Sequence, residues 1–291
     1  MVSKVAVVEI EENSIQTFEE AVRLVGGIAD LNKPDRRVVV KVGVFDPKSH
    51  HHTTVGVVDA IVEGFNKAPK VYLAESDNYR GAALDRLQIW KSLFSERVAP
   101  FDLSRDTDSR QVNIAGEKVS LSHILFKPNV LVSTHVLRIY ENGSVIKNLL
   151  GLTPDQKKAR FHNLGLEKVL LDLYEAVGGI DLAVLDGTHM PLGVTPHSAA
   201  VDANILVVGR DAVAVEAVGA DLVGMKPEEI PAIREAGNRR LGEGNLDKIQ
   251  ILGTPYEDAK ERITSLIKAA KKKHKQSPKK ASAKKHKKKI S

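Results

Sequence analysis

Polar side chains that could bind a ligand or move protons lie at the ends of three apolar segments and inside a fourth. Lys41 lies inside VVVKVGV, Glu75 ends VYLAE, His135 ends VLVSTH and Asp186 ends LAVLD. In an open α/β sheet, ligands bind beyond the carboxyl ends of the strands, near helix N-termini. If these segments are parallel strands, their polar ends meet at one edge of the sheet, and we expect the functional site there.

The segment VLVSTHVLRIYENGSVIKNLLG holds the most informative pair. Lys147 follows His135 by twelve residues and stands beside Asn148, between apolar neighbours where a charge without a function would be unusual. An imidazole and an ammonium close together can do acid–base chemistry on a carbon acid or an alcohol, or can hold a carboxylate or a phosphate. We therefore predict His135 as a general acid/base and Lys147 as its anion-orienting or electrophilic partner. Asp186 is a third catalytic candidate, although it could equally be a turn or cap residue.

Lys41 interrupts an otherwise apolar strand. A buried ammonium is costly, so one interpretation pairs Lys41 with a carboxylate or a bound anion. The other interpretation places it on an edge strand, where its head would reach water. The sequence leaves both open.

Three adjacent histidines, His50, His51 and His52, could ligate a metal because imidazole is a common metal ligand. Neighbouring side chains of an extended loop point in different directions and cannot all bind one ion, so we favour a solvated loop. His135 and His189 form an alternative metal pair, but no motif of fixed spacing supports it. We therefore expect no metal site.

Several familiar motifs are absent. The sequence has no G-x-x-x-x-G-K-[ST] phosphate loop, no G-x-G-x-x-G after a strand and no G-x-S-x-G elbow. These absences argue against a standard nucleotide triphosphatase, dinucleotide dehydrogenase or serine hydrolase. The chain also has no cysteine, which excludes disulfides, thiolate zinc sites and cysteine-held iron–sulfur clusters.

The net charge of +6 divides into two parts. Residues 268–291 contain twelve Lys and no acidic residue, which leaves 31 basic against 37 acidic residues in the rest of the 291-residue chain. A segment so charged and so poor in apolar residues should be disordered past about Lys271. It could contact RNA, DNA, a ribosome or an anionic membrane surface without reading bases, since it has no Arg and no aromatic residue; the alternative is a tail that only adds solubility. The candidate nucleic-acid residues are Lys271, Lys272, Lys273, Lys275, Lys279, Lys280, Lys284, Lys285, Lys287, Lys288 and Lys289.

The elements that must position these residues alternate between strands and helices. β-Branched runs predict strands at 5–10, 37–44, 70–74, 130–133, 180–185, 205–208 and 249–252, and apolar residues at helical spacing predict helices at 17–24, 54–65, 167–177, 211–223 and 256–268. A hairpin is expected around Ala115-Gly116. This pattern predicts an α/β fold with a mainly parallel sheet and helices on both faces. We expect one domain over 1–268, with a division into two subdomains conceivable somewhere in 95–130, and a tail over 269–291. No run is long and apolar enough to cross a membrane and the start does not fit a signal peptide, so we expect a cytoplasmic protein.

From about Val38 to Gly253 the chain resembles the domain of unknown function 362 (DUF362), a widespread prokaryotic family. The blocks that carry the resemblance are VVVKVGV…HTTVGVVDAIVEGF, VYLAES, the series STH, IKNLLG and QKKARFH, then LAVLDGTH and VVGRDAVAVEAVGADLVG. Ser133 stands where the family usually has Lys, and Glu216 where Asp is expected. Many relatives carry a ferredoxin-like cysteine module, which this chain lacks. The positions that the resemblance singles out are Lys41, Thr54, Glu75, His135, Lys147, Asn148, Lys157, His162 and Asp186.

The family implies no settled activity, cofactor or substrate. The residues themselves favour a pocket for a small anionic ligand, a carboxylate or a phosphate, at the strand-end loops, with His135 and Lys147 as the acid–base pair if the protein is an enzyme. The alternative is a nucleic-acid- or ribosome-associated protein whose lysine-rich tail supplies the affinity.

Overall fold

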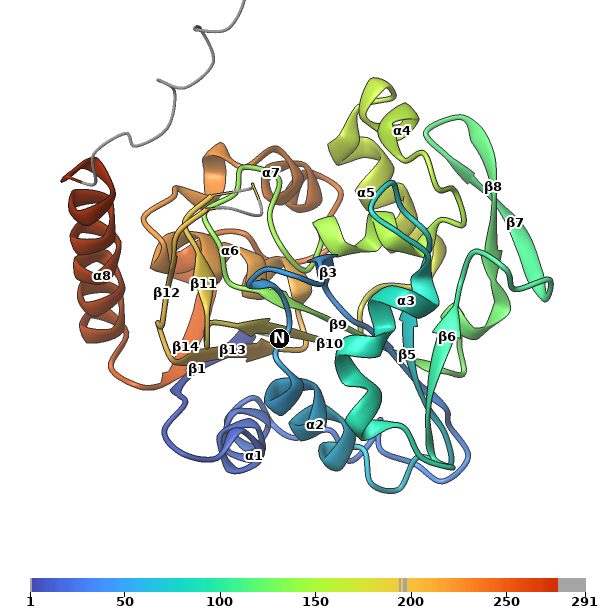
Figure 1. The fold of residues 1–291 in the computed structure, drawn as a ribbon, viewed down its shortest axis with the longest axis horizontal. Helices are drawn as coiled ribbons and strands as arrows, with labels where there is room; N and C mark the ends of the chain where they lie inside the picture. The colour runs from blue at the N-terminus through green and yellow to red at the C-terminus, as the bar shows by residue number, and fades with distance from the viewer. Residues whose placement is uncertain (1, 194, 196–197, 277–291) are drawn as a thin grey trace, which may run out of the picture.

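An eight-stranded sheet forms the centre of the molecule (Figure 1). The computed structural model describes residues 2–193, 195 and 198–276. Across the sheet the strands are ordered β14-β1-β13-β10-β9-β2-β5-β6, and β13 alone runs antiparallel to both of its neighbours among the described strands. The predicted α/β fold with a mainly parallel sheet is thus confirmed. The strands are β1 (Ser3–Glu9), β2 (Val38–Lys41), β5 (Val71–Glu75), β6 (Val98–Asp102), β9 (Val130–Val136), β10 (Leu182–Asp186), β13 (Ile205–Gly209) and β14 (Ile249–Gly253).

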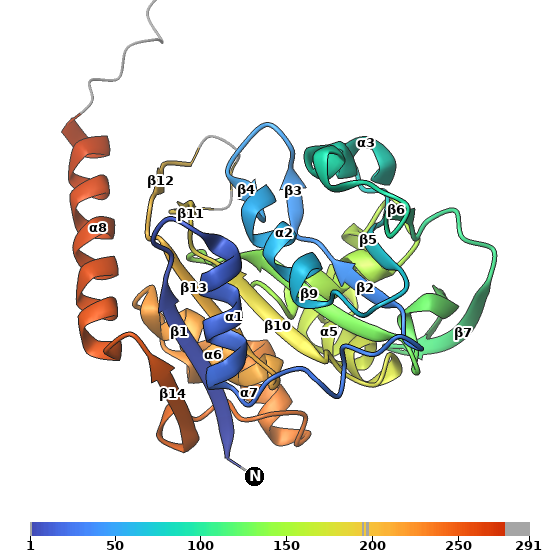
Figure 2. The same ribbon diagram turned by 90° about the horizontal axis from the view of Figure 1, so that it is seen from below.

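Helices cover both faces of this sheet, as predicted. Figure 2 shows α1 and α2 in front of the strands and α5, α6 and α7 behind them. Because side chains alternate along a strand, Val38 and Val40 pack into the core under α1 and α2, whereas Val39 belongs to the core under α5 and α6. The helices are α1 (Ser14–Leu24), α2 (Val55–Gly64), α3 (Ala83–Leu87), α4 (Ala159–Asn163), α5 (Leu166–Ala176), α6 (Ala212–Leu222), α7 (Pro231–Asn238) and α8 (Tyr256–Gln276). Short 3₁₀ helices are η1 (Gln88–Leu93), η2 (His123–Leu125), η3 (Lys147–Leu152), η4 (Pro227–Glu229) and η5 (Leu246–Lys248).

The strand expected over 37–44 is divided into two pieces. β2 ends at Lys41, and after Gly43 the chain enters β3 (Val44–Asp46), which pairs with β4 (His51–His52). A Cβ at Gly43 would lie 2.6 Å from Cγ of His135, so a glycine is needed where the chain passes over that imidazole. β2 itself lies between β9 and β5, and the edge-strand interpretation of Lys41 is therefore wrong.

Besides the β3–β4 pair, two further two-stranded sheets lie outside the central one. The hairpin expected around Ala115-Gly116 is confirmed as β7 (Ser109–Ile114) and β8 (Glu117–Ser122), and both central residues have positive φ, at 51° and 91°. Its apolar residues Val119 and Leu121 belong to the same core as α5, and the division into two subdomains stays a prediction. The other pair is β11 (Met190–Pro191) with β12 (Ala200–Val201).

The last helix is longer than the sequence pattern predicted. α8 docks through Ala259, Ile263 and Ile267, whose spacing of four residues places them on one face, and it then continues to Gln276. The helix thus extends a few residues past Lys271, where we expected disorder to begin. The physical reason is that Lys and Gln propagate a helix well once a docked segment has nucleated it. Among the described residues, no helix is both long and apolar enough to cross a membrane.

Candidate functional site

A cavity of about 560 Å³ opens at the carboxyl ends of β2, β5 and β9. It lies at the edge of the sheet where parallel strands bring their polar ends together. The charged and polar groups that line it come from seven separate stretches of the chain. They include Lys41, Glu75, Asn78, Tyr79, Arg80, Arg86, His135, Arg138, Tyr140, Lys147, Asn148, Gln156, Lys158, His162 and Thr195.

The floor of the cavity is an ion network of Lys41, Glu75 and Arg86, hereafter the buried ion network. Nζ of Lys41 lies 3.1 Å from Oε1 of Glu75, and a guanidinium nitrogen of Arg86 lies 2.9 Å from Oε2. All three side chains are buried. One carboxylate therefore compensates two cations, and burial lowers the pKa of Lys41 although Glu75 opposes the shift.

Asn148 ties this network to the loop after β9. Its Oδ1 accepts a hydrogen bond of 2.8 Å from Nζ of Lys41, while its Nδ2 donates to the backbone oxygens of Lys41 at 2.8 Å and Thr134 at 3.1 Å. Gly151 lies against the same pair, since a Cβ there would stand 2.5 Å from Cε of Lys41 and 2.7 Å from Oε1 of Glu75. The Asn and the Gly of the IKNLLG block are thus explained by the close approach of η3 to the ion pair.

His135 is buried, and its ring is held in one tautomer. Nδ1 accepts a hydrogen bond of 2.8 Å from the backbone N–H of Val136, so in the neutral ring the proton is on Nε2. Burial, together with the positive charges of Arg138 and Lys41, holds the pKa of His135 well below 6.5. At neutral pH this residue is a neutral imidazole with an N–H to donate.

Lys147 is the least compensated charge of the cavity. Within the part of the chain that the structure describes, its ammonium has no carboxylate partner and no hydrogen-bond acceptor. Burial is the main cause of its pKa falling from 10.5 to about 7, and the charges of Arg138, Lys158 and Lys41 lower it further. Lys158 follows the same pattern, because burial lowers its pKa to about 8 although it donates hydrogen bonds to neutral oxygens of Ser76, Thr153 and Asp155.

The loop that presents Lys147 is fixed from behind by a buried carboxylate of α6. Glu216 accepts hydrogen bonds from the backbone N–H groups of Ser144 at 2.6 Å and Ile146 at 2.9 Å. Gly143, with φ of 79°, makes this approach feasible, because a Cβ there would lie 2.8 Å from Cδ of Glu216. Ser133 is also buried and donates to the backbone oxygen of Val145 at 2.9 Å.

Six of the nine residues singled out by the sequence line the cavity, namely Lys41, Glu75, His135, Lys147, Asn148 and His162. Thr54 and Asp186 do not. Asp186 is buried and its Oδ2 accepts from both the backbone N–H and the hydroxyl of Thr54 at 2.7 Å, while its Oδ1 accepts from the N–H and the hydroxyl of Thr188. Thr54 in turn is the N-cap of α2. Asp186 and Thr54 together therefore fix the N-terminus of α2.

Lys157, the third residue outside the cavity, is exposed, and its neighbour Lys158 points inward instead. Among the lining residues that we did not predict are Arg86, Arg138 and the two tyrosines Tyr79 and Tyr140. Arg138 lies only three residues after His135, and this spacing from a predicted site residue is the signal that could have found it. Its guanidinium donates to the backbone oxygen of Gly143 at 2.9 Å, its buried Nε has no partner among the described atoms, and burial lowers its pKa to about 10.

The three consecutive histidines point to different surroundings, as predicted. The ring of His50 lies 5.0 Å from that of His189, His51 is hydrogen-bonded through Nε2 to the backbone oxygen of Thr195 at 2.9 Å, and the ring of His52 packs edge-on against Trp90. The expectation of a solvated loop is wrong for His51, which is buried. Among the described residues, no three His, Cys, Asp or Glu side chains gather closely enough to hold a metal ion.

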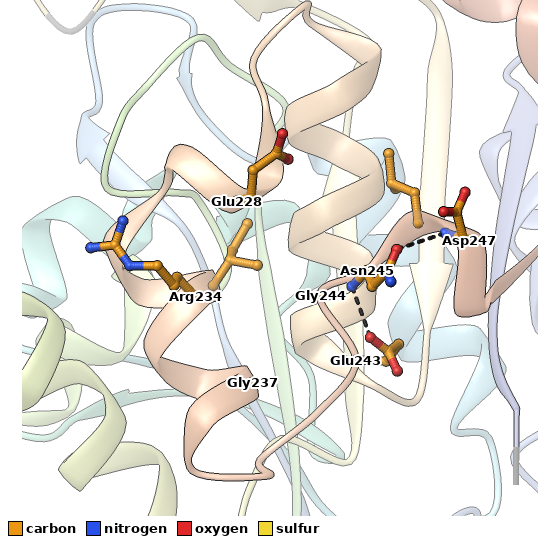
Figure 3. Close-up of a pocket in the computed structure, with 9 residues that line it drawn as sticks. Glu228, Arg234, Gly237, Glu243, Gly244, Asn245 and Asp247 are labelled. Atoms are coloured by element: carbon orange, nitrogen blue, oxygen red, sulfur yellow. Dashed lines mark hydrogen bonds between the residues drawn. The ribbon is translucent and has the colours of Figure 1, made fainter.

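A second hollow, also of about 560 Å³, lies between α7 and the loop before η5 (Figure 3). Its polar groups bond mainly within their own loop, as when the N–H of Asn245 donates to Glu243 at 2.8 Å. Glu228, Arg234 and Asp247 on its wall are exposed. Acidic and basic groups that are already solvated have no need of a ligand, so we place the site in the first cavity.

The lysine-rich end of the chain is described only in part. Lys271, Lys272 and Lys273 are exposed on the last turns of α8, and Lys275 belongs to the same helix. Lys279, Lys280, Lys284, Lys285, Lys287, Lys288 and Lys289 lie outside the described residues.

The fold and the cavity define a three-layer α/β protein with a cationic site at the carboxyl ends of its parallel strands. Residues 38–221 match the model of the family described as "Domain of unknown function (DUF362)", and the chain belongs to this family. The matched span contains the whole buried ion network, Lys147, Lys158 and Glu216. No curated protein matches the sequence. Among solved structures, loganic acid methyltransferase with SAH is similar over 89% of this chain and 68% of that chain, at 14% sequence identity and a TM-score of 0.24.

Proposed function

We propose that this protein binds a small anionic ligand, a carboxylate or a phosphate, in the cavity beyond β2, β5 and β9. The observation that carries the proposal is the ammonium of Lys147, which lines the cavity among cations and has no anionic partner in the described structure. Lys147 is half-buried, and a charge that is partly removed from water without a partner costs stability; such groups gather where function requires them.

The balance of charge around the cavity supports the same conclusion. Glu75 is the one carboxylate among the described lining residues, and the buried ion network already uses both of its oxygens. Arg138, Lys147 and Lys158 are therefore left with neutral partners or none. An anion placed between them would replace mutual repulsion by attraction and would accept charge-assisted hydrogen bonds.

Within this site His135 and Lys147 have complementary roles. His135 offers an N–H from Nε2 to an oxygen of the ligand, and Lys147, with a pKa of about 7, can gain or lose a proton near neutral pH. The two groups could thus perform acid–base chemistry on a bound carbon acid or alcohol. We give Asp186 and Thr54 a positioning role at α2, because the hydrogen bonds of Asp186 are made within the protein.

The experiment is a thermal-shift titration with orthophosphate, acetate, oxalate and pyruvate on the full chain. We expect at least one of these anions to raise Tm, and Lys147→Ala to abolish the effect. Lys157→Ala is the matched control, since this lysine is exposed beside Lys158 and does not line the cavity. An anion that stabilises Lys147→Ala as strongly as the unchanged protein would remove the cavity from the proposal.

A further inference from the structure

We propose that the ligand of this cavity carries a flat aromatic ring as well as its anionic group, and that Tyr79, Phe45 and Arg80 receive the ring. This inference rests on the proposed function, because it describes the part of the ligand that the cations do not hold. All three residues line the same cavity as Lys147 and Lys158.

Tyr79 is an unusual surface residue. Its exposed fraction is 70%, and of the large hydrophobic residues that are exposed in the described structure, the other two, Val2 and Leu84, do not line the cavity. An exposed aromatic ring at the entrance of a pocket leaves apolar area in water unless a ligand covers it.

The turn that carries Tyr79 is held firmly. Asn78 and Gly81 exchange both of their backbone hydrogen bonds at 3.1 Å, and Oδ1 of Asn78 accepts from the N–H of Arg80 at 2.7 Å. The turn is anchored at its start, where Asp77 takes part in two further bonds, accepting one from the N–H of Ala83 and donating its own N–H to Oγ of Ser104, both at 2.8 Å. Tyr79 is thus presented outward by an ordered backbone, which lowers the entropic cost of binding a ring against it.

Tyr79 also belongs to a group of two aromatic rings and a guanidinium that pack against one another. The ring of Phe45 lies 6.2 Å from that of Tyr79 in an edge-to-face arrangement, and the guanidinium of Arg80 lies 4.7 Å from the centre of the Phe45 ring and 5.3 Å from that of Tyr79. Asp46 holds Arg80 in place at 3.2 Å. Aromatic faces and guanidinium planes both stack on flat rings, so this group selects planarity rather than apolar bulk alone.

A further ring lines the cavity from the loop after β9. Tyr140 lies over the guanidinium of Arg138, with 4.7 Å between the guanidinium carbon and the ring centre. The cavity therefore combines cations with π-faces, and its volume of about 560 Å³ falls in the range that pockets for drug-sized ligands occupy. An isolated phosphate or acetate would leave the aromatic part of the lining uncovered.

The test measures affinities for matched pairs of anions by calorimetric titration of the full chain. The pairs are AMP with ribose 5-phosphate, phenyl phosphate with methyl phosphate, and phenylpyruvate with pyruvate, so that nucleotide, aryl phosphate and aryl carboxylate sources are told apart. In at least one pair we expect the aromatic member to bind at least about fivefold more tightly, which is what one base gains from stacking on an aromatic side chain. Tyr79→Ala should remove this difference and leave the affinity of the non-aromatic member unchanged. Tyr79→Phe should preserve the difference, and Leu84→Ala, a control at another exposed apolar residue, should have no effect.

The outcomes separate the two proposals. Equal affinities within every pair, with binding of the non-aromatic members, would overturn the aromatic subsite and leave the anion site standing. A preference for aromatic members that survives Tyr79→Ala would overturn the assignment to Tyr79. Failure of all six compounds to bind would overturn the anion site, and the aromatic subsite with it.

Discussion

Replacing Lys147 by Met should make the ligand-free protein more stable while abolishing anion binding. Met is close to Lys in length and carries no charge, so it keeps most of the packing of the side chain and removes the uncompensated ammonium. Most substitutions of partly buried residues destabilise a protein, which gives this prediction an unusual sign.

The magnitude follows from the pKa of Lys147. A fall from 10.5 in the unfolded chain to about 7 in the folded protein corresponds to about 5 kcal/mol at 1.36 kcal/mol per pKa unit. This value is a ceiling, because water in the cavity can relax around the charge, and we expect a gain of about 2–5 kcal/mol in the free energy of unfolding.

The gain should also depend on pH. Below pH 7 Lys147 is protonated in both states, and the folded state carries the full cost. Between pH 7 and 10.5 folding releases a proton, so the cost declines as the pH rises, and even the ceiling value falls to about 1 kcal/mol at pH 9.5. The advantage of Lys147→Met is therefore largest at acidic pH and small at alkaline pH.

The assay is urea unfolding of the unchanged protein and the variant at pH 6 and pH 9.5. Lys157→Met is the control, and a substitution at this exposed position should change the free energy of unfolding by no more than about 0.5 kcal/mol. A loss of stability in Lys147→Met, or an equal gain at both pH values, would refute the view that the folded state carries an uncompensated charge at Lys147.

Three further predictions concern the buried ion network, the glycine beside it and the lysine-rich tail. Glu75→Gln leaves two cations of the buried ion network without a counter-charge and should lower the free energy of unfolding by about 3–5 kcal/mol. Glu63→Gln, in an exposed ion pair, is the control and should lower it by at most about 1 kcal/mol. Equal losses for the two variants in urea unfolding at pH 7 would contradict this prediction. Gly151→Ala places a methyl group 2.5 Å from the nearest side-chain carbon and should cost about 1–3 kcal/mol, whereas Gly237→Ala, with nothing within 4 Å, should be neutral or slightly stabilising in the same assay. Truncation after Gln276 removes seven lysines and should abolish retention on RNA at low salt without changing anion binding; unchanged retention would exclude the tail as a polyanion-binding segment.

Local signals predicted the elements that position the site. The predicted helices at 54–65 and 211–223 begin at the N-caps Thr54 and Asp211, and the hairpin turn lies at Ala115-Gly116 as expected, because each of these signals acts on backbone groups within a few residues of itself. The antiparallel β13 was not predicted, since strand direction is decided by pairing with β1 and β10, which lie far away in the sequence. The elements α3, η1 and β6 were not predicted either, because the apolar residues in this region show no clear helical or strand periodicity.

The part of the site that lies at the carboxyl ends of the strands could be predicted from the sequence. Lys41, Glu75 and His135 come together because β2, β5 and β9 are parallel neighbours, and the sequence supported that arrangement. Whether Lys157 or Lys158 enters the cavity depends on the conformation of the turn before α4. Two identical neighbouring residues in the sequence give no sign of which one that turn directs inward. Asp186 could not be distinguished as catalytic or structural, because one of its partners, Thr54, lies 132 residues away.

The charges of this cavity fall into two groups that make opposite demands on the fold. The members of the buried ion network are paired with one another inside the protein, so removing one of them leaves a buried charge unpaired whether or not a ligand is present. Lys147 stands outside it, and Glu216 uses its two buried hydrogen bonds to hold the loop that keeps Lys147 at the cavity. A fold that fixes an unfavourable charge so firmly gains nothing from it in the free state, which is the pattern expected where function outweighs stability. The two groups can be told apart by sign. Substitutions in the buried ion network should lower the free energy of unfolding, whereas neutralising Lys147 should raise it and abolish anion binding.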